Sequence, residues 1–301
     1  MAQTDSNSKS PLRLLEDRFI EGAGFPYCPG GGFRPDATAW AILALEAAGS
    51  TSGSADKARR LLVKAQGDDG RVCVWPQDPD AYWPTALAAL AWSGAPGFDE
   101  PRNKAVRFLL ESNLVGVFEG SQIGESHDVT ICGWPWTVRA HPWVEPTAYV
   151  LLALRACGYG THRRAADAVS LLVDRQLPAG GWNVGTTVTF GKEMWPTPEA
   201  SGLALQALAG RVPKSNVEMS IAYLQAQLPT LKAPMSIGWA FLALHAWQET
   251  IERPEEKILE VLARQELRGP CDTFSLSLLL LAEHCPAGLV RFWENRQEAP
   301  E

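Results

Sequence analysis

The hydrophobic residues of this chain form two alternating kinds of helix. The first kind is a short run rich in Ala and Leu that is apolar on every side, as expected of a helix buried all round. Because self-similarity at a period of a few tens of residues is typical of repeat architectures, the pattern predicts a fold of repeated helical units. The apolar runs lie at 36–45, 84–90, 145–154, 199–208, 234–244 and 271–281.

The second kind of helix is apolar on one face only. Ala58, Leu61, Leu62 and Ala65 lie at positions i, i+3, i+4 and i+7, and charged residues occupy the opposite face. One-sided helices of this kind belong on an outer layer of a globular fold. They are predicted at about 11–21, 55–66, 102–113, 163–176, 215–227 and 255–266.

Outer and inner helices that alternate in this way predict an all-α (α/α)6 toroid. An open solenoid of helix pairs is the main alternative, but it would leave one side of the apolar inner helices exposed. We expect a single toroid domain at 10–288, between a disordered tail at 1–9 and a polar C-terminal tail at 289–301.

Signals at the helix ends agree with these boundaries. Ser215 and Glu218 have the spacing of a capping box at the start of an outer helix. Several inner helices are followed by a glycine suited to a left-handed C-terminal cap. These glycines are Gly49, Gly94, Gly158 and Gly210.

Composition excludes several classes of protein. Hydrophobic residues make up 46% of the 301 residues, yet no apolar run reaches the ~18 residues that span a bilayer, which leaves only peripheral membrane contact open. A net charge of -7 favours solubility and argues against nucleic-acid binding. Six cysteines without a CxxC pair indicate a reduced, cytoplasmic protein, and the oligomeric state is left unspecified.

One segment carries a family resemblance. Gln176 closes a predicted outer helix and is followed by Gly180 and Trp182. This segment resembles the QW repeat of the squalene cyclase and protein prenyltransferase superfamily, whose members are terpenoid cyclase-like α-toroids. A glutamine that ends an outer helix can pair with free backbone carbonyls, so we predict a structural role for all three residues. The glutamine recurs at Gln66, Gln227 and Gln265.

Four acids at the starts of inner helices are the candidate catalytic residues. Asp36, Glu145, Glu199 and Asp272 would together ring one rim of the lumen. The resemblance places the cyclase acid motif at 34–39, where only Asp36 remains, and protonation of an alkene needs an unusually strong acid. Each acid also fits a simpler role, as a helix cap or as a first-turn acid favoured by the helix dipole.

No metal and no cofactor are predicted. The zinc site of the prenyltransferases would require Cys271, Asp272 and His284 to converge on one ion. Cys271 and His284 are thirteen residues apart on one predicted helix, a separation of ~20 Å.

Aromatic residues are concentrated on the inner helices and on the loops that precede them. An apolar cavity lined by ring faces would suit an isoprenoid or another apolar ligand, although rings on inner helices also serve as core. The predicted substrate-binding residues are Trp40, Trp75, Tyr82, Trp83, Trp134, Trp136, Trp143, Tyr149, Trp195 and Trp239.

Three functions are consistent with the sequence. The resemblance implies a toroid that binds an isoprenoid or other apolar ligand in an aromatic-lined lumen and cyclises or transfers it. A second hypothesis is a non-catalytic binding or scaffold protein that has lost the catalytic acids and zinc ligands. The third is an (α/α)6 carbohydrate-active enzyme, in which Glu145 and Glu199 would form the carboxylate pair.

Overall fold

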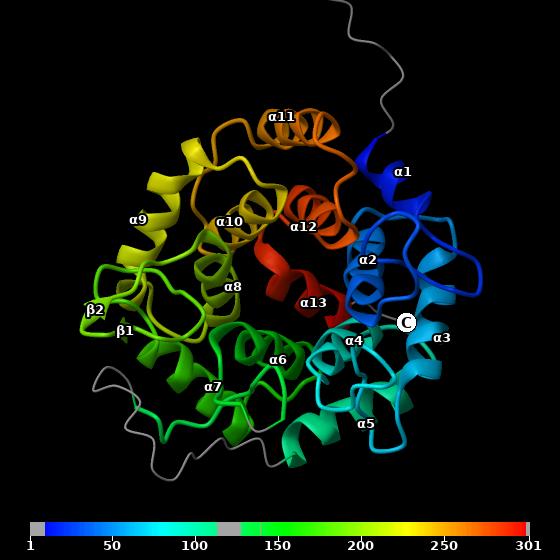
Figure 1. Cartoon of the computed structure of the whole chain (residues 1–301), viewed down its shortest axis with the longest axis horizontal. Coiled ribbons are helices and arrows are strands. Elements are labelled where there is room, and N and C mark those ends of the chain that lie inside the picture. Colours follow the sequence, from blue (N-terminus) through cyan, green and yellow to red (C-terminus); the bar gives the residue numbers. More distant parts are fainter. Residues whose placement is uncertain (1–9, 113–127, 139, 299–301) are drawn as a thin grey trace, which may run out of the picture.

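The structure is a computed structural model that describes residues 10–112, 128–138 and 140–298. Its inner helices form a closed ring, because each contacts the next and α12 returns to contact α2 (Figure 1). The predicted (α/α)6 toroid is therefore confirmed, and the open solenoid is excluded. The inner helices are α2 (Pro35–Ala47), α4 (Pro84–Trp92), α6 (Val144–Ala156), α8 (Pro198–Leu208), α10 (Pro234–Ala246) and α12 (Thr273–His284).

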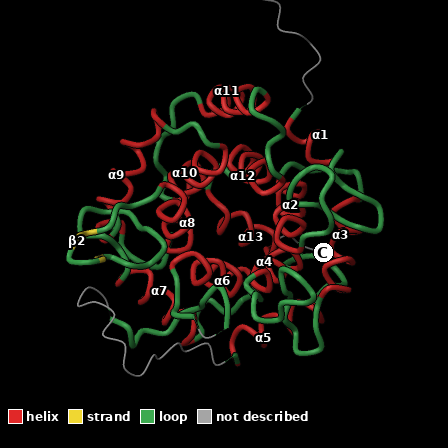
Figure 2. Tube along the Cα trace, in the orientation of Figure 1, coloured by secondary structure: helices red, strands yellow, loops and turns green. Residues whose placement is uncertain are grey.

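The amphipathic helices surround this ring, as the one-sided pattern predicts (Figure 1). They are α1 (Pro11–Glu16), α3 (Ser54–Ala65), α5 (Asp99–Glu111), α7 (Arg163–Asp174), α9 (Glu218–Gln227) and α11 (Pro254–Glu266). Two 3₁₀ turns, η1 (Lys214–Asn216) and η2 (Leu228–Thr230), flank α9. The antiparallel pair β1 (Val188–Thr189) and β2 (Lys192–Glu193) lies at the outside of the ring (Figure 2).

The helix caps predicted from the sequence are present in the structure, with one exception. The four predicted cap glycines all have positive φ, between 65° and 84°, which confirms the left-handed caps. The capping box at Ser215 and Glu218 is wrong. Ser215 lies in η1, and Val217 precedes α9 without a side-chain hydrogen bond, because the 3₁₀ turn occupies the position that the capping residue needs.

Hydroxyl side chains tie the loops to the starts of the inner helices. The hydroxyl of Thr147 accepts from the backbone N–H of Trp134 (3.0 Å) and donates to its carbonyl (3.3 Å). Thr38 does the same with Phe25 and Thr85 with Val72, each thirteen residues earlier. Ser201 makes the matching pair of bonds with Trp182, nineteen residues earlier. We call these contacts the hydroxyl clamps.

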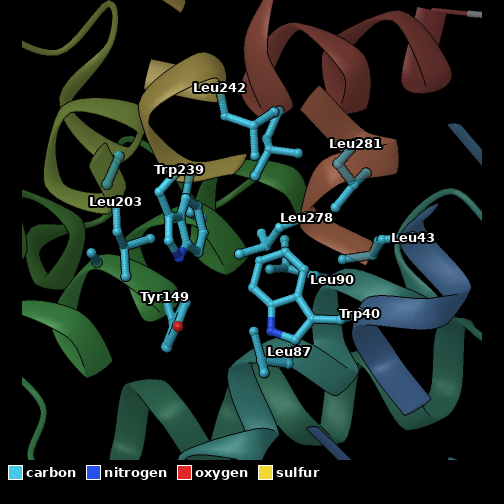
Figure 3. Close-up of a cluster of buried hydrophobic side chains, with 14 of the residues drawn as sticks. Trp40, Leu43, Leu87, Leu90, Tyr149, Leu203, Trp239, Leu242, Leu278 and Leu281 are labelled. Carbon is cyan, nitrogen blue, oxygen red and sulfur yellow. The ribbon is translucent and has the colours of Figure 1, made fainter. Parts of the chain in front are cut away.

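The inside of the ring is arranged in tiers one helical turn apart. Asp36 and Trp40 on α2, like Glu145 and Tyr149 on α6, are four residues apart, and such residues share one face of a helix. Acids therefore stand at the end of the ring where the inner helices begin, and rings lie one turn below them. Leucines fill the next tier, including Leu43, Leu90, Leu242 and Leu281 (Figure 3).

A further helix, α13 (Gly288–Glu298), closes the opposite end of the ring. It contacts α6, α8 and α10 and lies across the centre in Figure 1. Gln206 on α8 accepts from the Leu289 N–H (3.2 Å) and donates to the Leu242 carbonyl (2.9 Å). The predicted polar tail at 289–301 is thus wrong for 289–298, because Leu289 and Trp293 form a buried apolar stripe within a polar composition.

Within the described residues, no single helix is long and apolar enough to cross a membrane. One pair of helices, Thr273–His284 with Gly288–Glu294, matches by length and composition alone and is bent by 71° at the junction.

The hydroxyl clamp on α6 can be tested with Thr147→Val. This change keeps the shape of the side chain but leaves the N–H and carbonyl of Trp134 without their partner, and we expect a loss of about 1–3 kcal/mol of unfolding free energy in urea. The control Thr147→Ser keeps the hydroxyl and should lose only about 0.8 kcal/mol for one methyl group. A valine variant at least as stable as the serine variant would contradict the clamp.

The role of α13 can be tested with Trp293→Ala. The Trp293 side chain is 2% exposed, and removal of a buried tryptophan costs about 3–5 kcal/mol. The exposed Arg291 on the same helix is the matched control, and Arg291→Ala should change stability by less than about 0.5 kcal/mol. Equal denaturant midpoints for both variants would mean that α13 is not part of the folded core.

Candidate functional site

The four acids predicted from sequence lie at the end of the toroid where the inner helices begin. Asp36 is in the first turn of α2, Glu145 in that of α6 and Glu199 in that of α8, and Asp272 directly precedes α12. We call this end of the toroid the rim. The structure brings Glu145 within electrostatic reach of Glu199, and it gives the four acids different partners.

Two of the acids have partners that account for them. Asp272 caps α12, because its carboxylate accepts from the Ser275 N–H (2.8 Å) and from the Ser275 hydroxyl (2.7 Å). Asp36 is buried and forms a two-pronged ion pair with Arg34, at 2.9 and 2.8 Å. The guanidinium of Arg34 also lies over the rings of Tyr27 (5.3 Å) and Trp75 (4.8 Å).

Glu145 and Glu199 have no capping role, and they have no ion-pair partner among the described residues. The cap of α8 is Thr197, which accepts from the Ala200 N–H (3.3 Å), and α6 starts without a side-chain cap. Among the described residues no Lys, Arg or His forms an ion pair with either glutamate. The only hydrogen bond given to the pair in that part of the chain comes from the Ser236 hydroxyl, which donates to Glu199.

The electrostatics of the pair differ from those of a solvated acid. Burial raises the pKa of the Glu145 carboxyl above its ordinary value, and repulsion from Glu199 on the neighbouring helix α8 adds to the shift. Tyr149 is fully buried, and burial together with Glu145 and Asp36 raises its pKa well above the ordinary value. The pKa of Tyr223 is also raised, first by burial and then by Glu199. A carboxyl whose pKa is raised beside a second carboxyl is a usual arrangement for acid–base chemistry.

The rings expected to line the lumen fill it instead. Trp40 and Trp239 are each 2% exposed and contact each other edge to face, with centroids 5.5 Å apart (Figure 3). Tyr149 contacts both of these rings, at 6.0 and 6.4 Å. Trp83 and Trp136 are partly buried and cover Tyr149 from the rim side, with their own centroids 5.1 Å apart.

Other rings in the predicted binding set lie elsewhere. Tyr82 and Trp134 point to the outer layer, because Tyr82 packs on Phe108 and the Trp134 indole donates to the Leu109 carbonyl (3.2 Å). Their predicted role in substrate binding stays a prediction. Trp75 is half-exposed at the rim beside Arg34, and Trp143 is half-buried against His141. Trp195 is 85% exposed on the loop that leads into α8.

The Gln–Gly–Trp segment joins neighbouring units of the ring. The Gln176 amide donates to the Ser220 hydroxyl on α9 (2.7 Å), and a side chain at Gly180 would collide with the backbone of Met219. The Trp182 indole donates to the Leu172 carbonyl (2.6 Å), which fastens the loop to α7. Gln66 makes the equivalent contact with Pro101 on α5 (2.9 Å).

Sequence reasoning missed Arg34, Ser236 and Tyr223. The Arg34–Asp36 ion pair could have been predicted from the sequence, because Arg34 precedes Asp36 by two residues at the start of a helix. Nothing in the sequence indicates that Ser236 and Tyr223 lie near Glu199, because their proximity depends on how α8, α9 and α10 pack. Within the described ranges, no three His, Cys, Asp or Glu side chains lie close enough together to hold a metal ion.

Comparison with known proteins gives a fold but no family. No model of a known protein family matches the chain, and no curated protein matches it. A crystal structure of a protein from Actinoplanes superposes with a TM-score of 0.57 at 19% identity, over 92% of this chain and 98% of that chain. An inactive variant of the α-1,6-mannanase GH76A of Salegentibacter sp. HEL1_6, in complex with α-1,6-mannotriose, superposes with a TM-score of 0.59 at 13% identity, over 92% and 97%.

These findings correct the family assignment. At such identities the similarities show the fold alone, and a glycosidase has that fold, so membership of the squalene cyclase and prenyltransferase superfamily is wrong. The predicted isoprenoid or other apolar ligand is withdrawn with it. The physical reason is that Gln176, Gly180 and Trp182 hold adjacent helices together, a task that arises in any ring of helix pairs.

The uncompensated pair predicts that Glu145 lowers stability at neutral pH. Its folded-state pKa is raised above the unfolded value, so its contribution is fully favourable below about pH 4 and is lost as pH rises through the raised pKa. Glu145→Gln should therefore melt at a higher temperature than the wild type at pH 7, and this difference should shrink towards pH 4. Differential scanning calorimetry of both proteins measures it.

Glu193→Gln on β2 is the matched control for the melting experiment. Glu193 is exposed, so this variant should melt like the wild type at both pH values. A Glu145→Gln protein that melts below the wild type at pH 7 would show that the carboxylate is stabilised by its surroundings.

Proposed function

We propose that this chain is a carbohydrate-active enzyme that hydrolyses glycosidic bonds at the rim. The observation that carries the proposal is the pair Glu145 and Glu199, which do not cap their helices and form no ion pair with any cation that the structure describes. Two carboxyl groups with different protonation are what glycoside hydrolysis requires. The (α/α)6 mannanase of similar fold, solved with α-1,6-mannotriose, supports this class of substrate.

The two glutamates divide the chemistry between them. Glu145, whose pKa is raised by burial and by Glu199, carries the proton that is transferred to the glycosidic oxygen as the bond to the anomeric carbon breaks. Glu199, held in place by the Ser236 hydroxyl, takes the proton from the water that adds to the anomeric carbon. The bond that breaks is thus replaced by one carbon–oxygen bond from water, and the proton lost by Glu145 is balanced by the one gained at Glu199.

Exposed aromatic faces on the loop that leads into α8 suit a sugar. Trp195 lies four residues before Glu199, and the Tyr223 hydroxyl donates to the intervening Pro196 carbonyl (3.0 Å). Phe190, in the turn between β1 and β2, is fully exposed. Exposed rings of this size provide flat apolar surfaces on which the C–H face of a sugar ring can stack.

The activity can be tested on a panel of neutral oligosaccharides that includes α-1,6-mannotriose and the corresponding α- and β-linked glucans and mannans. We expect hydrolysis of at least one member, detected by mass spectrometry of the products. Glu145→Gln and Glu199→Gln should each lower kcat by about 10²–10⁴, the usual contribution of an acid or base catalyst. The rate should also fall as pH rises through the raised pKa of Glu145, because the acid loses its proton.

Glu193→Gln serves again as the control, since Glu193 is exposed on β2 and should leave kcat unchanged. Hydrolysis that survives in both glutamine variants would remove the pair from the mechanism. A chain that cleaves no glycan of the panel would contradict the proposed function itself.

A further inference from the structure

A cavity lies at the end of the toroid opposite the rim, where α13 covers the ends of the inner helices (Figure 1). Its volume is about 310 Å³, at the lower end of the range for small-molecule sites. The charged and titratable residues that line it are Arg155 on α6, His245 on α10, and Arg291 and Glu294 on α13. Arg291, Glu294 and the lining residue Gln248 are exposed, so solvent reaches the cavity.

This end of the toroid has more positive than negative charge. Among the described residues that line the cavity, Glu294 is the one carboxylate, and it is shared between Arg291 (3.4 Å) and Arg155 (4.0 Å). Arg211, just outside the lining, lies within electrostatic reach of Arg155 and adds a third guanidinium group. One carboxylate therefore stands against three cations, and the site is short of negative charge.

Arg155 is a buried cation whose counter-charge is incomplete. Its side chain is 12% exposed, and its Nη1 donates to the carbonyls of Ala207 (2.9 Å) and Ala209 (2.7 Å) at the end of α8. Burial lowers the pKa of the Arg155 guanidinium to about 10, an effect that Glu294 opposes and Arg211 increases. A buried cation whose nearest carboxylate is 4.0 Å away is unfavourable, and an anion beside it would restore the charge balance.

His245 and Gln248 bring uncharged polar groups to the same cavity. The His245 Nδ1 is buried and has no hydrogen-bond partner in the described part of the chain. Gln248 ends α10 with a φ of 59°, whereas α2 and α6 end with Gly49 and Gly158 in the same hydrogen-bonded position. A side chain is unfavourable in this left-handed conformation, and residues held in it are concentrated at binding sites.

These groups set the chemistry of the ligand. A guanidinium group donates hydrogen bonds in a planar fork that fits the oxygens of a phosphate or a carboxylate. The Gln248 amide can donate to a further oxygen of the same molecule. The negative ends of the helix dipoles also meet here and weaken anion binding, but Arg155 already pairs with the last carbonyls of α8. A neutral ligand would leave the charge of Arg155 uncompensated.

We propose that this cavity binds a small molecule carrying a phosphate or carboxylate group, whose oxygens pair with Arg155 on α6 and Arg291 on α13. The bound anion supplies the counter-charge that Glu294 provides only in part, and it links α13 to the ring. None of the rim residues takes part, so the inference is independent of the proposed hydrolysis.

The test is isothermal titration calorimetry of the whole chain in a buffer without phosphate, sulfate or carboxylate. The probes are inorganic phosphate, glycerol 3-phosphate and acetate, and glycerol is the uncharged control. We expect at least one anionic probe to bind and to raise Tm, because a ligand that binds only the folded state stabilises it. The phosphate and acetate titrations show which of the two groups the cavity prefers. If no anionic probe binds, or if glycerol binds as tightly as glycerol 3-phosphate, the inference is overturned.

Matched variants locate the binding in this cavity. Arg291→Gln should weaken binding of the anion at least about tenfold, and Glu294→Gln, which removes the competing carboxylate, should tighten it about tenfold. Gln248→Gly restores the glycine of the other helix ends, so this variant should be at least as stable as the wild type and still bind more weakly. Arg253→Gln is the charge-matched control, since Arg253 is exposed at the start of α11 and outside the cavity.

The pattern across these variants decides the outcome. A ligand site requires Glu294→Gln to gain affinity, a result that a purely structural role of α13 does not produce. Equal affinities in Arg291→Gln and Arg253→Gln, or no gain in Glu294→Gln, would show that the anion binds elsewhere and would overturn the inference.

Discussion

The hydroxyl clamps at the starts of the inner helices determine where everything else at the rim lies. Each clamp uses one side-chain hydroxyl to satisfy both the N–H and the carbonyl of a loop residue, as Thr147 does for Trp134. A long loop contributes many backbone polar groups that must be paired if it is to be buried. Because four helix starts are tied in this way, the loops are fixed against the ring, and the acids next to the clamps are fixed with them.

Because of this arrangement, Glu145 and Glu199 are not needed to cap the N-termini of their helices. Proline at the first position of α2 and α8 removes an N–H that would otherwise need a partner, and Thr197 caps α8. Glu145 and Glu199 are consequently left without a capping role, although the burial of Glu145 and its repulsion from Glu199 are unfavourable. Local interactions that oppose stability, while the rest of the fold is consistent, are characteristic of functional sites.

The sequence was sufficient for the ring because its information is local and repeated. Apolar helices that alternate with one-sided helices leave few other arrangements, and cap glycines such as Gly158 mark the ends. The closing helix α13 was missed because Leu289 and Trp293 are diluted by polar neighbours, so its burial depends on the far end of the ring. The family assignment failed for a related reason: Gln176 and Gly180 record contacts between adjacent outer helices, which reflect the fold rather than the reaction.

The sequence offered Glu145 and Glu199 as a carboxylate pair under the carbohydrate-active hypothesis alone, because what separates them from Asp36 and Asp272 is the charge balance around the rim. On the α2 and α12 side, Arg34 neutralises Asp36, and Arg18 lies within electrostatic reach of Asp272. On the α6 and α8 side no described cation compensates the glutamates. The two halves of the rim therefore differ: Asp36 and Asp272 are held by ion pairs and caps, whereas Glu145 and Glu199 have no described cation partner. In the proposed function, a ring built from similar repeats thus has one reactive side, and the four candidate acids suggested by the sequence reduce to one candidate pair.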